Sequence, residues 1–264
     1  MDTGIRGFVI IIGFLVCTGV CITATTAQDN SLKNLTYLTE EFPPFNYEEN
    51  GTPAGLAIDL LAAVTREAGD GIPAGDIRIV PLNEGLSTVR NTTGAVIFSI
   101  ARTPGRENDY RWIGPFATYS IVLFSLRDRN ITSLSAGELR DYTIGAVTSD
   151  VSVEKLAELG VSPEHIVTNP DPAELFRMLD EGTIDLVASG DIAGEYFMKK
   201  TDRNPESYRI VYRIESTPLY YAFNKETPGE LIGRFKQAYE RVKSEKDQDG
   251  TTAYDRVLKK YLSS

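Results

Sequence analysis

The sequence predicts an α/β fold with largely parallel sheets. Strand-like and helix-like segments alternate through most of the chain, which is the pattern of helices packed on a parallel sheet. The segment AVIFSIA, residues 95–101, is almost wholly apolar and so predicts a strand buried on both faces. At 264 residues the chain is long enough for one large domain or two smaller ones.

The alternation divides into two units of similar design. The first unit spans residues 33–118, and its helix at 55–69 places Leu56, Leu60 and Val64 on one face. Its strands are expected within 35–42, 76–82 and 95–101.

The second unit spans residues 119–216, with strands expected within 120–128, 142–147 and 183–189 and a helix at 152–160. Asp171 predicts an N-cap for a further helix, with Pro172 at its first position and Gly182 ending it. Strands at 209–214 and 218–225 and two amphipathic helices from Gly229 complete the chain, and these helices are expected to pack on the first unit.

Residues 1–27 have the pattern of a secretory signal peptide or an N-terminal anchor. One positive charge precedes an apolar run over residues 7–22, and small residues end at Ala27, the cleavage position if the segment is a signal peptide rather than an anchor. This segment predicts that the protein is extracytoplasmic. Both cysteines, Cys17 and Cys21, lie within it, so the rest of the chain can form no disulfide.

The net charge and the absence of catalytic or metal-binding motifs in the sequence exclude several classes of function. The net charge of −10 argues against a nucleic-acid partner, which needs clustered basic residues. The single histidine, His165, lies in a loop, and no catalytic triad or paired metal-ligand spacing is present in the sequence. No cofactor and no metal are therefore expected.

The stretch SIARTPGRENDYRWIGPF, residues 99–116, predicts an anion site. Thr103 can cap a helix that begins at Pro104, and Arg106 would then lie in its first turn. Free N–H groups at a helix start and an arginine fork both favour a carboxylate. Arg102, on another face, is interpreted as a structural salt-bridge partner.

The segment TEEFPPFNYEENGTPAGLAIDLLAAV, residues 39–64, followed by the Thr103–Arg106 motif, resembles the extracellular solute-binding proteins of polar amino-acid ABC transporters, family 3. The spellings Ala-Arg-Thr-Pro and Trp-Ile-Gly-Pro resemble a divergent subgroup. The resemblance implies a type II periplasmic-binding-protein fold, with two α/β lobes joined by two crossing strands. These would lie at 116–124 and 214–223, giving lobe 1 from residues 28–118 and 217–264 and lobe 2 from residues 119–216.

The resemblance also implies a function and a site. The chain would be a monomer that closes two lobes on a small carboxylate-bearing solute, such as an amino acid, and delivers it to an ABC transporter permease. Arg106 takes the family's carboxylate position, Ser99 and Ala101 its backbone contacts, and Phe42 its ring-stacking position, although Phe42 can equally be a core residue. Thr148 or Ser149 would contact the ligand from lobe 2, unless that turn only caps a helix through Asp150 or Ser152.

The sequence departs from the family at the ligand's ammonium group. Gly190 stands at the expected acidic position, with Asp191 one residue later, and Thr39 stands at a second acidic position. Asp191 is taken as the candidate ammonium ligand. Two alternatives remain open: an enzyme of the dehydratase or glycosidase type on the same fold, and a ligand sensor.

Overall fold

The computed structural model describes Met1 and residues 31–148 and 150–261. The predicted signal peptide or anchor lies outside the described residues. The main sheet has eight strands, in the spatial order β4-β1-β5-β10-β6-β9-β7-β8. Their bounds are Thr36–Thr39 (β1), Ile77–Ile79 (β4), Ala95–Ala101 (β5), Tyr110–Leu126 (β6), Ile144–Val147 (β7), Ile166–Asn169 (β8), Leu186–Gly190 (β9) and Tyr208–Asn224 (β10).

Lobe 1 is built on the parallel strands β4, β1 and β5. Four helices belong to it: α1 (Leu56–Glu67), α2 (Leu82–Asn91), α6 (Gly229–Ser244) and α7 (Ala253–Tyr261). Val96 and Phe98 of β5 pack in one cluster with α1 and α6, whereas Ala95 and Ile97 pack with α2 on the other face. Burial on both faces explains why the β5 segment is apolar at nearly every position.

Lobe 2 is built on the parallel strands β9, β7 and β8. Its helices are α3 (Val151–Glu158), α4 (Pro172–Glu181) and α5 (Asp191–Lys200). The predicted caps of α4 are confirmed, because the Asp171 carboxylate accepts from the Ala173 N–H and Gly182 has a φ of 78°. The α4 and α5 side of the sheet and the α3 side each carry their own apolar cluster.

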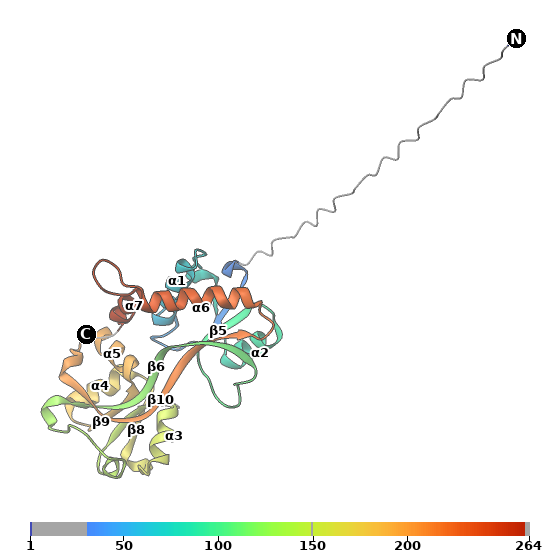
Figure 1. Cartoon of the computed structure of the whole chain (residues 1–264). Helices are drawn as coiled ribbons and strands as arrows, with labels where there is room; N and C mark the ends of the chain where they lie inside the picture. The colour runs from blue at the N-terminus through green and yellow to red at the C-terminus, as the bar shows by residue number, and fades with distance from the viewer. Residues whose placement is uncertain (2–30, 149, 262–264) are drawn as a thin grey trace.

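Two long antiparallel strands, β6 and β10, run through both lobes and pair along most of their length. They cross from the helices of lobe 1 to the helices of lobe 2, as Figure 1 shows. Both are longer than the sequence predicted, because Tyr110–Trp112 also pair with β10 and because residues 209–214 and 218–225 belong to one strand. These strands make the sheet mixed rather than largely parallel.

The smaller elements complete the architecture. A hairpin of β2 (Tyr47–Glu49) and β3 (Thr52–Ala54) follows β1. Short 3-10 helices occupy Leu32–Asn34, Ala74–Asp76, Arg127–Arg129, Ala136–Asp141, Pro163–His165 and Pro205–Ser207. Within residues 31–148 and 150–261, no helix is both long and apolar enough to span a bilayer.

Candidate functional site

A cavity of about 210 Å³ lies where the two lobes face each other. Lobe 1 contributes Phe42 and Pro43 from the loop after β1, and the crossing strand β6 contributes Tyr119. Lobe 2 contributes the ends of β7 and β9 and the starts of α3, α4 and α5. The cavity is lined by Phe42, Pro43, Tyr119, Val147, Asp150, Pro172, Ala188, Ser189, Gly190, Ala193 and Phe197. Ligands of α/β proteins bind at such carboxyl ends of parallel strands.

Aromatic rings form one side of this cavity. The Phe42 ring stacks on Phe45, with centroids 5.1 Å apart, and meets the Tyr119 ring edge-on at 5.0 Å. Phe45 is completely buried, whereas Phe42 and Tyr119 are partly exposed. Phe42 therefore belongs both to the edge of the lobe 1 core and to the cavity, so the two interpretations of its role are compatible.

Gly190 and Tyr119 fit together at the end of β9. A Cβ at residue 190 would lie 2.5 Å from Cε2 of Tyr119, so the ring occupies the space of a side chain there. Burial raises the pKa of the Tyr119 hydroxyl, and the nearby Asp150 and Asp191 carboxylates raise it further. Tyr119 is thus held as a neutral phenol beside two acids.

The candidate residue Asp191 begins α5 and makes local contacts. Its Oδ1 accepts from the backbone N–H of Ser120 at 3.3 Å and from its neighbour Ile192 at 2.9 Å. Its Oδ2 lies 3.1 Å from Nη1 of Arg213. The carboxylate therefore ties α5 to both crossing strands, and it is not among the described residues that line the cavity.

The segment that carries Arg106 differs from the prediction. Residues 104–109 form successive turns between β5 and β6, so the prediction of a helix capped by Thr103 is wrong. The Thr103 carbonyl accepts from the Arg106 N–H at 2.9 Å, but the next hydrogen bond, from Asp109 to Arg106, again closes only a three-residue turn. The candidate carboxylate position at Arg106 therefore lacks the helix N–H groups that the sequence suggested.

The Arg106 guanidinium is partly buried near the end of β5. Its Nη1 lies 3.4 Å from the carbonyl of Ala101, which brings these two candidate residues together. Burial raises the pKa of the nearby Glu40 carboxyl, and the Arg106 charge opposes that rise. Arg106, Ala101 and Ser99 stand beside the loop after β1 but are not among the described lining residues of the 210 Å³ cavity.

Ser99 has an unusual backbone conformation. Its φ is +64°, and it occupies the irregular position where Tyr221 pairs with Phe98 and Tyr220 with Ile100. The residue is 2% exposed, and its buried hydroxyl hydrogen-bonds to none of the described residues. A non-glycine residue with positive φ is strained, and such strain concentrates at functional sites.

On lobe 2, Thr148 is exposed after β7, while Ser149 lies outside the described residues. Asp150 caps α3 by accepting from the Ser152 N–H at 2.8 Å, as the capping alternative predicted. Asp150 also lines the cavity, so capping and ligand contact are not exclusive.

Arg102 pairs with Glu107 through two nitrogen–oxygen contacts, with Nε to Oε2 at 2.7 Å. Its interpretation as a structural salt-bridge partner is confirmed. Thr39 is fully buried, and its hydroxyl donates to the Phe98 carbonyl at 3.2 Å, so it is occupied within lobe 1.

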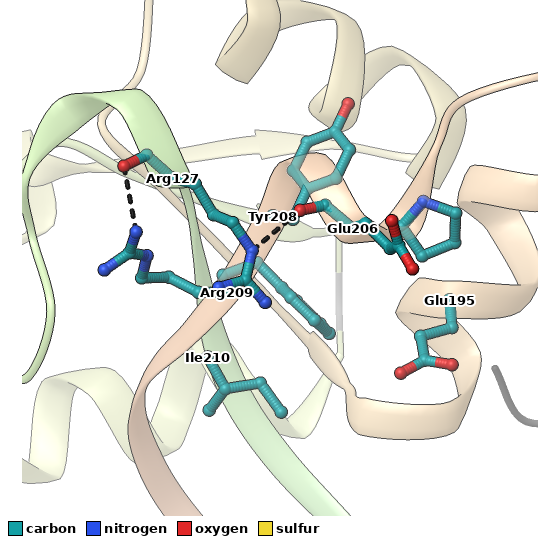
Figure 2. Close-up of a pocket in the computed structure, with 8 residues that line it drawn as sticks. Arg127, Glu195, Glu206, Tyr208, Arg209 and Ile210 are labelled. Atoms are coloured by element: carbon teal, nitrogen blue, oxygen red, sulfur yellow. Dashed lines mark hydrogen bonds between the residues drawn. The ribbon is translucent and has the colours of Figure 1, made fainter. Parts of the chain in front are cut away.

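A larger cavity of about 410 Å³ lies on lobe 2, lined among others by Arg127, Glu195 and Ile210. Figure 2 shows the Arg127 side chain crossing it, with Nε donating to the Glu206 carbonyl at 2.7 Å. The Arg127 carbonyl in turn accepts from Nη2 of Arg209 at 3.0 Å. All residues of this cavity belong to lobe 2 and the lobe 2 ends of β6 and β10, so lobe closure cannot enclose a ligand there.

Among the cavity residues that sequence reasoning missed are two aromatic ones, Tyr119 and Phe197. Tyr119 lies within the segment that was expected to cross between the lobes, which was the available signal. Phe197 belongs to α5, a helix that the prediction did not include.

Comparison with known proteins extends these findings. Residues 35–261 match the family described as bacterial extracellular solute-binding proteins, family 3. The chain is 24% identical over 226 residues to the arginine-binding extracellular protein ArtP of Bacillus subtilis, which covers 84% of this chain and 86% of that protein.

Solved structures share the fold. The second substrate-binding domain of Lactococcus lactis GlnP in its open conformation superposes with a TM-score of 0.67 at 18% identity, covering 88% of this chain and 97% of that one. A polar amino-acid uptake transporter substrate-binding protein from Streptococcus thermophilus gives a TM-score of 0.70 at 18% identity, covering 89% and 88%. With two α/β lobes, two crossing strands and a family match over most of its length, the chain belongs to the extracellular solute-binding proteins, family 3.

Proposed function

We propose that this protein captures a small carboxylate-bearing solute, of the amino-acid class, between its lobes and delivers it to the permease of an ABC importer. The observation that carries the proposal is the cavity lined from both lobes and from the crossing strand β6. A movement of either lobe changes this cavity directly, which is what reversible capture by closure requires. The arginine-binding relative supports an amino-acid-like ligand.

In this proposal Arg106 binds the ligand carboxylate, with the backbone of Ser99 and Ala101 beside it. The guanidinium is partly buried, and its side-chain hydrogen bond within the described residues goes to the Ala101 carbonyl at 3.4 Å, so its other donors can turn to an anion. Phe42 would pack on the ligand, and Thr148, Ser149 and Asp191 would contact it from lobe 2 after closure.

Arg106 and Arg102 offer a matched test. Replacement of Arg106 by alanine should lower ligand affinity by about 2–5 kcal/mol, because a partly desolvated charge pair is lost. Arg106→Lys should recover only part of this, since an ammonium cannot form the two parallel hydrogen bonds. Arg102→Ala should leave affinity unchanged and alter the free energy of unfolding by about 0–1 kcal/mol, as for an exposed pair.

Isothermal titration calorimetry against a panel of amino acids and small carboxylates measures these affinities, with circular dichroism as the control for folding. Equal affinity in the parent and in Arg106→Ala would show that the anion site lies elsewhere. Turnover of a bound compound, detected by mass spectrometry of the recovered ligand, would favour the enzyme alternative.

We propose that the lobes divide at residues 118/119 and 216/217. These positions face each other in the β6–β10 ladder, where Tyr119 pairs with Thr217 and Thr118 with Pro218. Residues 118, 215, 216 and 218 are exposed, so few side-chain contacts restrain bending of the ladder there.

We also propose export to the outer side of the cytoplasmic membrane through residues 1–27, as a cleaved signal or a retained anchor, and action as a monomer. Mass spectrometry of the native protein tests this location. A cytosolic chain that begins at Met1 would contradict it.

A further inference from the structure

We propose that the cavity between the lobes binds a methylated, quaternary ammonium group, so that the solute is an amino acid of the betaine class. This inference rests on the proposed function, which supplies the carboxylate site at Arg106. It adds the chemistry of the opposite end of the ligand, read from the residues that line the cavity.

The lining is aromatic with a single carboxylate. Phe42, Tyr119 and Phe197 come from lobe 1, the crossing strand and lobe 2, so all three parts of the molecule contribute an aromatic ring to the cavity lining. Phe45 covers one face of Phe42, and the cavity therefore meets its other face or its edge. Aromatic faces attract cations that shed their water easily, and quaternary ammonium groups are the best example.

Asp150 gives this surface its negative charge. Its Oδ1 is occupied by the Ser152 N–H, and no described cation pairs with the carboxylate. The other lining residues are uncharged, and most are apolar. A monovalent cation is therefore matched in charge, whereas a second anion is not.

Hydrogen-bonding capacity separates the classes of cation. A primary ammonium brings three N–H donors and a guanidinium five, and each buried donor needs an acceptor. Among the described lining residues, side-chain acceptors are limited to Tyr119, Asp150 and Ser189. A trimethylated nitrogen has no N–H donor and leaves none unsatisfied.

The contact between Gly190 and Tyr119 fixes the Tyr119 ring in the cavity wall. Because the ring lies where a side chain of residue 190 would project, β9 presents an aromatic surface there instead of a polar group. The ring is also held against Phe42 and Phe45, so it is supported from lobe 1 as well.

A methylation series tests the inference with the carboxylate held constant. Calorimetry on the full chain should show affinity rising from glycine through N-methylglycine and N,N-dimethylglycine to trimethylglycine, with trimethylglycine at least tenfold tighter than glycine. Tyr119→Leu, which keeps an apolar side chain without a ring, should lose most of this gain. Tyr212→Leu, a partly buried tyrosine of lobe 2 away from the cavity, is the matched control and should keep it. Asp150→Asn retains an N-cap and should weaken both trimethylglycine and glycine, because both carry the positive charge that the carboxylate balances.

The outcomes separate the two proposals. Tighter binding of glycine, or of any unmethylated amino acid, than of trimethylglycine overturns the inference and leaves the proposed function standing. If none of the four compounds binds, the inference is also overturned. Calorimetry with the full amino-acid panel then tests the proposed function separately. If choline binds as tightly as trimethylglycine, the aromatic assignment holds and the carboxylate role of Arg106 is overturned. Circular dichroism of each variant excludes misfolding as the cause.

Discussion

Ser99 combines a positive φ, deep burial and a hydroxyl without a described partner. A non-glycine residue in this conformation costs about 1–2 kcal/mol, because Cβ approaches the neighbouring carbonyl. The irregular pairing with β10 maintains the conformation and turns the backbone at the end of β5 toward Ala101 and Arg106. Strain at this position is therefore best explained by the proposed carboxylate site.

Replacement of Ser99 by glycine should relieve the strain. We expect the free energy of unfolding to rise by up to about 1 kcal/mol, while ligand affinity is retained, because the proposed contact of Ser99 with the ligand is made by its backbone. Ser125→Gly is the control: Ser125 is buried in β6 and is not among the positive-φ residues, so its loss should destabilise the fold by at least 0.5–1 kcal/mol, about the usual cost of glycine in a strand. Urea unfolding measures both, and destabilisation by Ser99→Gly equal to that of the control would contradict the argument.

Individual residues differ in how well the sequence predicted them. The Arg102 ion pair could be predicted from local sequence alone, since a glutamate lies five residues from Arg102. The Tyr119–Gly190 contact depends on β6 pairing with β9, where Ile121 faces Gly190. No local property of either segment indicates that register.

The start of helix α7 is capped by reciprocal hydrogen bonds between Thr252 and Asp255. Asp255 Oδ2 accepts from the Thr252 N–H at 3.1 Å, and Thr252 Oγ1 accepts from the Asp255 N–H at 2.9 Å. The backbone and hydroxyl of Thr252 lower the pKa of Asp255 below its ordinary value. A lowered pKa stabilises the fold above the unfolded pKa of about 3.9, and this stability is lost as pH falls through the folded pKa.

We therefore expect Asp255→Asn to be less stable than the parent at pH 7, and the difference to shrink below pH 4. Urea unfolding of both proteins at pH 7 and pH 3 measures it. A difference in the free energy of unfolding that stays constant with pH would show that the carboxylate charge does not hold this cap.

Among the elements, α4 was predicted with both ends because Asp171, Pro172 and Gly182 are local signals. Helices α2 and α5 were missed, and both contain a glycine that weakens helix propensity. In α2, a Cβ at Gly85 would lie 2.6 Å from Cδ1 of Ile97, so the glycine allows close packing on β5. Tertiary packing therefore stabilises a helix that its own sequence favours only weakly.

At the scale of the molecule, Tyr47 of the β2–β3 hairpin and Tyr196 of α5 join the two lobes beside the cavity. Their ring centroids are 5.8 Å apart. Burial, and next a hydrogen bond with Tyr196, raises the pKa of Tyr47. This pair links lobe 1 to lobe 2 outside the crossing strands, so it limits how freely the lobes move.

Tyr196→Ala should remove a ring pair worth about 0.5–1.5 kcal/mol and broaden the distribution of distances between the lobes. Tyr196→Phe keeps the ring and should have a smaller effect. Spin labels at Ser87→Cys in α2 and Ala157→Cys in α3, both exposed, report the distance by double electron–electron resonance, with Cys17 and Cys21 replaced by serine. Identical distributions in the parent and Tyr196→Ala would show that the crossing strands alone set the lobe orientation.

The return of β10 to lobe 1 also determines the order in which the molecule can be completed during synthesis. Lobe 1 needs the last third of β10 and the helices α6 and α7, whose Arg234 and Lys260 pair with Asp70 and Asp59 near α1. The ribosome makes these residues after all the strands and helices of lobe 2. The first part of lobe 1 must therefore remain incomplete, with its apolar α1 face uncovered, until α6 and α7 have been made. A chain with this topology cannot complete lobe 1 until these helices are made, and an incompletely folded polypeptide is the form that can be threaded through a translocation channel.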